Sequence, residues 1–248
     1  MTGQGTPLVI LHGFLGTSDN WRTHARYWSS HFEVHAIDQR NHGKSFHSEA
    51  FDYDILAQDV VAYMDANKLE NAVVLGHSMG GKTAMTLALH YPERVLQLIV
   101  ADIAPKKYDV ASKSSSIIEG LLHLDANTFT SRATADDALA TFVTEVGVRQ
   151  FLLKNLAWTP QRTLKLKCNI QVLQHKLDEI GAAPKEAEFE GKTLFLGGQN
   201  SDYILEHDLA KIQTYFPNAT LKWIADAGHW LHAENPKAFT AALHDFLD

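Results

Sequence analysis

The amino-acid sequence predicts an α/β fold, in which a mostly parallel sheet is flanked by helices and carries an inserted helical cap. Short runs that are apolar throughout alternate with helix-length amphipathic segments, the pattern of a parallel sheet covered on both faces. One long stretch in the middle of the chain lacks such runs and predicts the insertion. The length of 248 residues suits one α/β domain with an insertion, and 45% hydrophobic residues suffice for a sizeable core.

The alternating segments follow a regular order along the chain. The expected strands are residues 8–11, 34–38, 72–76, 98–102, 193–197 and 221–224. The expected helices lie near residues 20–30, 53–67, 79–90, 206–215 and 236–246. Most of these strands are apolar at every position, as is typical of strands buried on both faces.

Residues 105–184 contain only helical patterns, at 117–124, 135–145 and 148–156, and no strand-like run. This stretch is longer than a crossover between two strands requires. We therefore expect a core formed by residues 1–105 and 186–248, and a helical cap formed by residues 106–185. Aromatic side chains of the cap either line a substrate cleft or hold the cap together; they are Phe129, Phe142, Phe151 and Trp158.

The composition argues against several classes of protein. Lys and Arg number 22 against 29 Asp and Glu, and the net charge of −7 argues against binding to nucleic acid or to an anionic membrane. The mean hydropathy is −0.18, and apolar runs such as 8–11 and 95–101 are too short to span a bilayer. The single cysteine, Cys168, rules out an internal disulfide and a cysteine-rich metal site. Residues 1–7 lack the features of a signal peptide, so a cytoplasmic protein is expected.

Residues 76–80 read Gly-His-Ser-Met-Gly and lie between an apolar strand and a helix-forming segment. This Gly-x-Ser-x-Gly pattern is typical of a nucleophile elbow, a turn so tight that its flanking positions must lack large side chains. Such a turn holds the hydroxyl of Ser78 at a helix N-terminus, where the dipole stabilises a developing anion. Ser78 is therefore the predicted nucleophile.

The same segment also fits a nucleotide-binding motif. Residues 76–83 match Gly-x4-Gly-Lys-[Ser/Thr], and the strand that ends at Asp102 could serve as the magnesium-binding strand of a P-loop protein. That interpretation leaves the loops described next, and a histidine near the C-terminus, without a role. In the elbow interpretation, Lys82 and Thr83 are ordinary residues of the first helical turn.

The first expected strand ends in His12-Gly13-Phe14. A serine nucleophile needs two backbone N–H groups directed at the oxyanion of the tetrahedral intermediate. Met79, directly after the nucleophile, and Phe14, in the loop after a neighbouring strand, are the predicted donors. His12 is then a turn-stabilising residue and not a catalytic one.

Residues 38–45 combine charged, glycine and short polar residues after the second strand. They predict a tightly hydrogen-bonded loop with a structural ion pair between Asp38 and Arg40, and His42 as a turn residue. The alternative is that Arg40 binds a phosphate or a carboxylate.

A general base for Ser78 must reach its hydroxyl and titrate near neutrality, as histidine does. His229 follows the last expected strand, and Gly228 before it lets the loop bend back over the sheet. His229 is the predicted base. His232 falls at the start of a helix and is discounted.

Two carboxylates could orient this histidine, as a serine–histidine pair requires. Asp102 lies at the end of the strand after the nucleophile helix, in an apolar setting where an idle carboxylate would be costly to bury. Asp202 lies five residues beyond the end of the next strand and opens an apparent helix, so it fits a helix N-cap. Asp102 is favoured, and Asp202 stays open as the alternative.

Together these motifs resemble the α/β-hydrolase superfamily over nearly the whole chain. More narrowly, the chain resembles the small bacterial YbfF-type esterases. The motifs are Asp-x-Arg-Asn-His-Gly-x-Ser at 38–45, Gly-His-Ser-Met-Gly-Gly-Lys at 76–82, Asp-Ile-Ala-Pro at 102–105 and Gly-His-Trp at 228–230, with a further match at 150–155 in the cap. The resemblance implies hydrolysis of carboxylic esters and acyl thioesters without a cofactor. It also implies that the acid follows the earlier strand, as Asp102 does.

One departure from the superfamily concerns the edge of the sheet. Only about seven residues precede the first His-Gly strand, where the superfamily usually has further strands. The opening edge of the sheet is therefore expected to be shortened or absent, at a cost in edge stability and not in activity.

The predicted function is hydrolysis of a small-molecule ester or thioester through an acyl-enzyme on Ser78. Lyases, C–C hydrolases and perhydrolases of this fold keep the same serine triad and stay open as alternatives, whereas a carboxylate nucleophile is excluded by Ser78. The sequence has no His-Glu-x-x-His or comparable cluster, so neither a metal nor a cofactor is expected.

Overall fold

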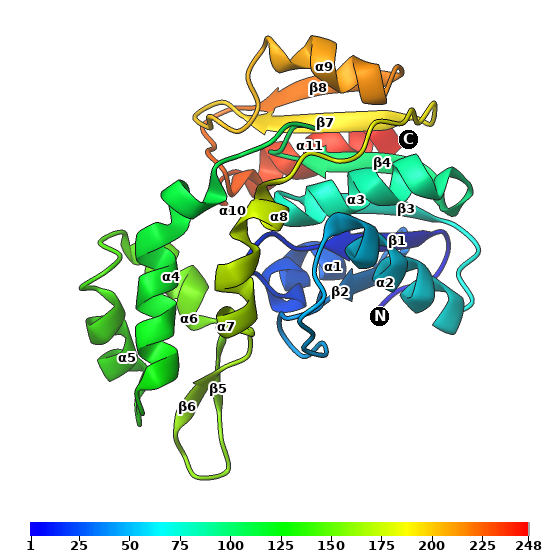
Figure 1. Ribbon diagram of the computed structural model, residues 1–248. Coiled ribbons are helices and arrows are strands. Elements are labelled where there is room, and N and C mark those ends of the chain that lie inside the picture. Colours follow the sequence, from blue (N-terminus) through cyan, green and yellow to red (C-terminus); the bar gives the residue numbers. More distant parts are fainter. Residues whose placement is uncertain (248) are drawn as a thin grey trace.

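The chain folds around a six-stranded sheet in the order β2-β1-β3-β4-β7-β8, and all neighbouring strands are parallel. This computed structural model describes residues 1–247 (Figure 1). The strands are β1 (Pro7–Leu11), β2 (Glu33–Ile37), β3 (Ala72–His77), β4 (Val95–Ala101), β7 (Thr193–Gly198) and β8 (Ala219–Ile224). The predicted fold class and all six predicted strands are confirmed.

Helices cover both faces of this sheet. They are α1 (Arg22–Trp28), α2 (Tyr53–Ala66), α3 (Met79–His90), α9 (Asp208–Tyr215), α10 (Leu231–Glu234) and α11 (Pro236–Leu247). Successive side chains of a strand point to opposite faces. Accordingly, Val9 and Leu11 belong to the cluster that contains α2 and α3 residues, whereas Leu8 and Ile10 belong to the cluster that contains α1 and α11 residues.

The strand order determines where a site can form. β1 pairs with both β2 and β3, so the chain proceeds to one side of β1 first and to the other side afterwards. In open parallel sheets, ligands bind outside the carboxyl ends of the strands at such a switch point. The loops after β1 and β3 lie at this position, and they contain Phe14 and Ser78.

The edge of the sheet next to β2 is short, as the sequence predicts. In residues 1–247, the pairing beyond β2 consists of an isolated antiparallel bridge between Thr2 and Val34. A single bridge leaves most of the outer edge of β2 unpaired.

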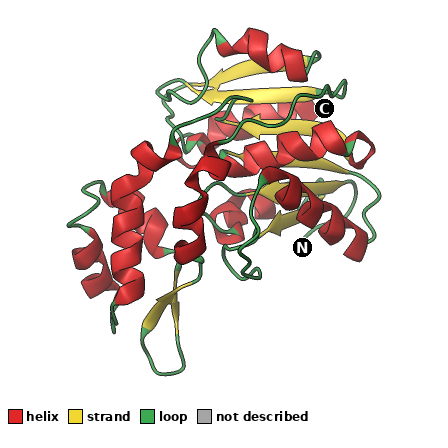
Figure 2. Ribbon diagram, viewed as in Figure 1, coloured by secondary structure: helices red, strands yellow, loops and turns green. Residues whose placement is uncertain are grey.

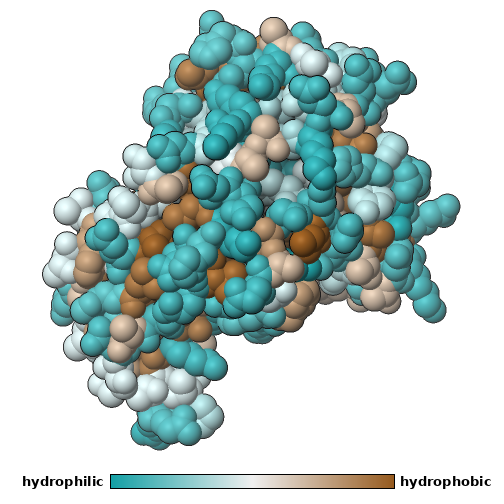
Figure 3. All heavy atoms as spheres, viewed as in Figure 1, coloured by the Kyte–Doolittle hydropathy of each residue, from teal (hydrophilic) through white to brown (hydrophobic). Residues whose placement is uncertain are grey.

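The cap elements lie between β4 and β7 in the chain and beside the sheet in space (Figure 1). They are α4 (Val110–Ala126), α5 (Arg132–Leu139), α6 (Val146–Leu153), β5 (Leu156–Trp158), β6 (Leu164–Leu166), α7 (Ile170–Leu173) and α8 (Leu177–Gly181). They share a hydrophobic cluster of their own, which Leu15, Tyr53 and Met79 of the core also join. Hydrophobic residues gather over this part of the molecule in Figure 3, whereas the rest of that face is mostly hydrophilic.

Two expectations for the cap are wrong. The stretch contains strands, since β5 and β6 form an antiparallel hairpin that projects away from the sheet (Figure 2). Each strand has three residues, too few for an alternating pattern to be recognised. The helix expected at 135–145 ends at Leu139, and Arg149 instead donates to the carbonyls of Val143 and Thr144 in the turn that follows.

Within residues 1–247, no helix has both the length and the apolar character needed to cross a membrane.

Close packing of α3 on β1 explains one glycine of the elbow. A Cβ atom on Gly80 would lie 2.3 Å from the carbonyl oxygen of Leu11 and 2.5 Å from that of His12. Both atoms belong to the backbone, which cannot move aside as a flexible side chain can. Gly80 therefore allows the first turn of α3 to approach the end of β1.

We expect Gly80→Ala to lower the free energy of unfolding by about 3 kcal/mol, because the added methyl group overpacks two backbone carbonyls. Gly147→Ala is the matched control, since a Cβ at this helical position in α6 meets nothing within 4 Å. It should raise stability by up to about 1 kcal/mol, through helix propensity. Urea denaturation measures both changes, and equal stability of the two variants would contradict the packing argument.

Candidate active site

Ser78 is the single residue between β3 and α3, and its backbone lies in an unusual conformation, with φ 53° and ψ −119°. Positive φ is strained for a residue with a side chain, and such strain is concentrated at functional sites. A Cβ on Gly76 would lie 2.1 Å from the carbonyl oxygen of Gly80, so the turn closes only with glycine at this position. These features are those of a nucleophile elbow.

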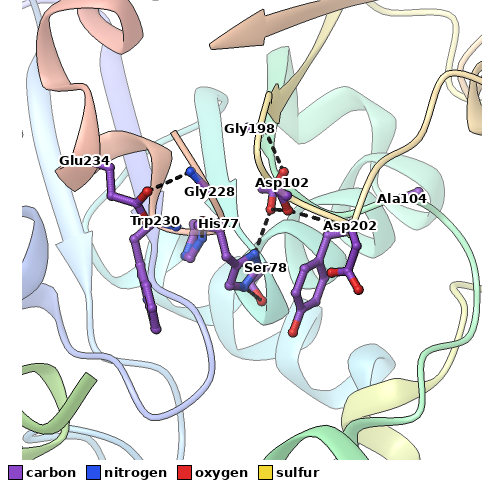
Figure 4. A network of polar contacts seen from close by, with 12 residues as sticks. His77, Ser78, Asp102, Ala104, Gly198, Asp202, Gly228, Trp230 and Glu234 are labelled. Carbon is purple, nitrogen blue, oxygen red and sulfur yellow. Dashed lines mark hydrogen bonds and ion pairs between the residues drawn. The ribbon is translucent and has the colours of Figure 1, made fainter. Parts of the chain in front are cut away.

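Three predicted residues meet at the carboxyl ends of the strands, and Figure 4 labels two of them, Ser78 and Asp102. His229 Nε2 lies 3.0 Å from Ser78 Oγ, and His229 Nδ1 lies 2.7 Å from Asp102 Oδ2. They come from the loops after β3, β4 and β8. The structure thus brings Ser78, Asp102 and His229 into one hydrogen-bonded chain.

Asp102 is completely buried, and both of its carboxylate oxygens have hydrogen-bond donors. Oδ1 accepts from the backbone N–H of Gly198 at 2.9 Å, and Oδ2 accepts from the hydroxyl of Ser201 as well as from His229. A buried carboxylate without such donors would be strongly destabilising. The loop after β7 therefore supports the carboxylate that follows β4.

Asp202 lies outside this chain of hydrogen bonds and contacts Lys113 of the cap. Its carboxylate forms an ion pair with Lys113 Nζ at 2.7 Å, and its side chain is 70% exposed. This hydrogen-bonded ammonium group lowers the pKa of Asp202. The expectation that Asp202 caps a helix is wrong, since α9 begins six residues later at Asp208. Residues 202–207 instead form turns that lead to α9.

A tyrosine ring lies flat against the imidazole of His229. Tyr203 stacks on His229 with 3.8 Å between the ring centroids and 17° between the planes. The hydroxyl of Tyr108 donates to the carbonyl of Tyr203 at 2.5 Å and accepts from the N–H of Ala104 at 2.9 Å. Neither tyrosine is predicted from the sequence, because the contacts of both depend on the adjacency of β4 and β7.

Glu234 and His77 hold the backbone of the loop that contains His229. Glu234 accepts from the backbone N–H groups of Gly228 at 2.6 Å and Trp230 at 3.2 Å, on either side of the histidine (Figure 4). His77 Nε2 donates to the carbonyl of His229 at 2.7 Å. Burial lowers the pKa of His77 well below its usual value, so this ring is neutral and has a fixed donor.

His232, which the sequence analysis discounted, contacts other groups. Its ring stacks on Trp21 with 4.3 Å between centroids, and burial lowers its pKa to about 3. It is thus a neutral aromatic residue of the core beneath the site.

The backbone N–H groups of Phe14 and Met79 are the predicted oxyanion donors. Within residues 1–247 neither group donates to a protein acceptor, and both residues line the cavity that contains Ser78. The loop of Phe14 is held by two buried histidines. His12 Nε2 accepts from the N–H of Gln39 at 3.1 Å, and His42 Nε2 accepts from the N–H that follows Phe14 at 3.2 Å. Both histidines are turn residues, as predicted.

The ion pair predicted within residues 38–45 is wrong. Arg40 pairs with Asp59 of α2 through two hydrogen bonds, of 2.5 and 2.7 Å. Asp38 instead accepts from the backbone N–H groups of Ser18 at 2.6 Å and Lys44 at 2.9 Å. The two side chains leave the loop toward different elements, which spacing along the chain does not reveal. With its guanidinium paired to Asp59, Arg40 is also not a free anion site.

The geometry of residues 76–83 does not suit a phosphate-binding loop. A P-loop needs a run of backbone N–H groups around the phosphates, whereas only Ser78 separates β3 from α3. Lys82 is not an ordinary residue of the first turn, as had been expected. It is 1% exposed, and its Nζ donates to backbone carbonyls where the cap joins the core. The expectation failed because α3 is buried on all sides, so its polar side chains also face protein.

A cavity of about 770 Å³ lies between the cap and the sheet, and Ser78 and His229 line it. Apolar side chains from both parts form much of its wall, among them Phe14, Met79, Ile117, Val148, Phe151 and Trp230. Of the four cap aromatics singled out in the sequence, only Phe151 lines this cavity. Phe129 and Phe142 pack in the cap cluster, and Trp158 is 53% exposed.

Within residues 1–247, no three His, Cys, Asp or Glu side chains are grouped so that they could hold a metal ion.

A parallel sheet that presents a serine elbow, a histidine and a buried carboxylate at the ends of its strands defines a hydrolase of the α/β type. The chain belongs to the alpha/beta hydrolase fold family, whose model matches residues 6–130. It is 37% identical to the sn-1-specific diacylglycerol lipase ABHD11 of Danio rerio, over 99% of this chain and 79% of that protein.

Two further relatives agree with this assignment. The chain is 34% identical to Esterase YbfF of Escherichia coli (strain K12), over 98% of this chain and 93% of that protein. A solved structure of a marine microorganism esterase superposes with a TM-score of 0.94 at 37% identity, over 99% of this chain and 97% of that one. The resemblance to the YbfF-type esterases is thereby confirmed.

The two carboxylates can be distinguished by Ser78 reactivity. We expect Asp102→Asn to slow phosphonylation of Ser78 by a fluorophosphonate by about 10⁴. With the amide oxygen on the N–H of Gly198, the neutral NH2 group faces Nδ1 as a donor and holds the imidazole in the wrong tautomer. Asp202→Asn is the matched control and should stay within several-fold of the unmodified protein. Labelling rates followed by mass spectrometry measure both, and the reverse pattern would assign the acid to the loop after β7.

Proposed function

We propose that this chain is a serine-nucleophile esterase that hydrolyses carboxylic esters, including acyl thioesters, through an acyl-enzyme intermediate. The observation that carries the proposal is the hydrogen-bonded chain from Asp102 through His229 to Ser78, in a cavity beside two free backbone N–H groups. The relatives named esterase and lipase support hydrolysis of esters. The proposed core comprises residues 1–105 and 186–248, and the proposed cap comprises residues 106–185.

Acylation begins when Ser78 Oγ attacks the acyl carbonyl carbon. A C–O bond forms as the hydroxyl proton moves to His229 Nε2, which lies 3.0 Å away. The resulting imidazolium is stabilised by Asp102, 2.7 Å from Nδ1. The tetrahedral intermediate then collapses, the bond to the alcohol or thiol breaks, and Nε2 returns the proton to this leaving group.

Deacylation repeats the sequence with water. His229 takes a proton from a water molecule as its oxygen attacks the acyl carbon, and Ser78 leaves with that proton. In both steps the N–H groups of Phe14 and Met79 stabilise the oxyanion. Their lack of protein acceptors supports this role, since a donor already engaged would have to break a bond first. The mechanism needs neither a cofactor nor a metal.

The cavity supports a small-molecule substrate with an apolar acyl group. Phe151, Val148 and Ile117 of the cap face the same space as Ser78. Burial of an acyl chain against such side chains stabilises the complex by about 0.8 kcal/mol for each methylene group.

Hydrolysis of p-nitrophenyl esters from acetate to palmitate tests the proposal. We expect turnover without added metal, and a loss of about 10⁶ in kcat for Ser78→Ala, because the reaction has no other nucleophile. Ser114→Ala is the matched control, since Ser114 lines the same cavity without a bond to His229. Equal turnover by Ser78→Ala, or none by the unmodified protein, would reopen the lyase, C–C hydrolase and perhydrolase alternatives.

A further inference from the structure

Lys82 makes an unusual set of contacts at the junction of cap and core. It lies on α3 one turn after Ser78, and its backbone N–H donates to the carbonyl of Ser78 at 3.1 Å. Its side chain is buried, and Nζ donates to the backbone carbonyls of Lys106 at 2.6 Å, Gly181 at 2.9 Å and Ala182. An ammonium group has three N–H donors, so these acceptors satisfy it completely.

The three carbonyls belong to the two places where the chain crosses between core and cap. Lys106 lies between β4 and α4, where the chain leaves the sheet, and Gly181 and Ala182 lie at the end of α8, where it returns. In Figure 1, α8 lies next to the start of α3. The two crossings also contact each other, because the N–H of Tyr108 donates to the carbonyl of Gly181 at 2.9 Å.

The surroundings of Nζ supply hydrogen bonds and aromatic rings but no counter-charge. Nζ lies 4.8 Å from the ring centroid of Tyr108 and 5.8 Å from that of Tyr53. Among the ion pairs of residues 1–247, none includes Lys82. Burial lowers the pKa of Lys82 to about 7, which reflects the cost of removing the cation from water. Three carbonyl acceptors match three N–H donors, so the hydrogen bonds to the two crossings favour the ammonium form that burial disfavours.

Residues beside both crossings line the cavity. Tyr108 and Val110 follow the outgoing crossing, Ile180 precedes the returning one, and all three form part of the cavity wall together with Lys82. A shift of either crossing would therefore move the wall against which the acyl group packs. Ser78, His229 and Asp102 take their direct hydrogen bonds from other loops. The outgoing crossing reaches His229 only indirectly, through the bond of Tyr108 to Tyr203.

We propose that Lys82 is a positioning residue that docks both ends of the cap on the nucleophile helix and so determines the acyl-chain preference of the cavity. The second half of this inference rests on the esterase function proposed above. Lys82 acts through the cap and does not touch the reacting atoms. A long acyl chain contacts the cap and depends on this docking, whereas an acetyl group depends mainly on the triad and the oxyanion donors.

Lys82→Met tests the docking, since methionine has a similar length but no donor. It removes this partner from the carbonyls of Lys106 and Ala182 and leaves that of Gly181 with the N–H of Tyr108 alone. Hydrogen exchange should become at least about tenfold faster at residues 106–110 and 180–183. The ratio of kcat/KM for the octanoyl ester to that for the acetyl ester should fall at least about tenfold, mainly through a higher KM for the octanoyl ester. Lys82→Arg keeps the charge and several donors, and it should restore most of both properties.

Lys192→Met is the matched control. Lys192 Nζ also donates to a backbone carbonyl, that of Phe246, and lies 4.7 Å from the centroid of its ring, far from the cap. This variant should leave the exchange of both crossings and the ester ratio unchanged. The proposal is overturned if folded Lys82→Met retains slow exchange at the crossings, or if Lys192→Met gives the same changes.

A measurement on the unmodified protein applies if Lys82→Met does not fold. Acetic anhydride should acetylate Lys82 at least about 100-fold more slowly than Lys185, whose side chain is 73% exposed. Lys82 should become accessible to the anhydride through the same local opening that exposes the amides of the crossings to hydrogen exchange. The free energy of this opening should be lower than the free energy of global unfolding. Equal labelling of the two lysines, or labelling only on global unfolding, would overturn the docking role. Neither measurement needs a substrate, so a failure of the esterase proposal alone would leave their outcome unaffected.

Discussion

The candidate site depends on the one-residue turn at Ser78. With glycines at positions 76 and 80, the end of β3, the start of α3 and the end of β1 approach within backbone contact. This approach places a hydroxyl and a free N–H at the positive end of a helix and beside the loop that contains Phe14. Positive φ at Ser78 is the local cost of the arrangement, and burial of α3 on both the sheet and the cap offsets it.

Burial of polar groups under this turn is tolerated because each has a defined partner. Asp102 has donors on both oxygens, and the buried rings of His12, His42 and His77 are neutral because burial lowers their pKa values. A neutral imidazole has one donor and one acceptor, so it can hold two loops at once. His229 differs from these rings in that its Nε2 meets a hydroxyl that can react.

Apolar packing and directional polar contacts, among them the hydrogen bonds of Lys82, Tyr53 and Asn155, join the cap to the core. Apolar side chains of the core, such as Leu15 and Met79, complete the hydrophobic cluster of the cap, whose burial is non-directional and tolerates small shifts. The hydrogen bonds of Lys82 are directional and occur where the chain crosses between the two parts. The first kind holds the cap near the sheet, whereas the second defines its position. The cavity lies between the cap and the core, so both kinds of interaction affect its dimensions.

The sequence by itself determined the six strands of the main sheet, the fold family, the elbow at Ser78 and the position of His229, because these features depend on local periodicity and on short motifs. From the residues alone, the choice between Asp102 and Asp202 as the carboxylate partner of His229 stayed open. The contacts of Tyr203, Glu234 and Lys82 were not predicted. The partners of Arg40 and the hairpin of β5 and β6 were also decided only by the tertiary structure. Each of these features depends on which loops and strands become neighbours across the fold. Contacts between residues distant in the chain follow from packing of the whole sheet, and a local pattern does not encode them.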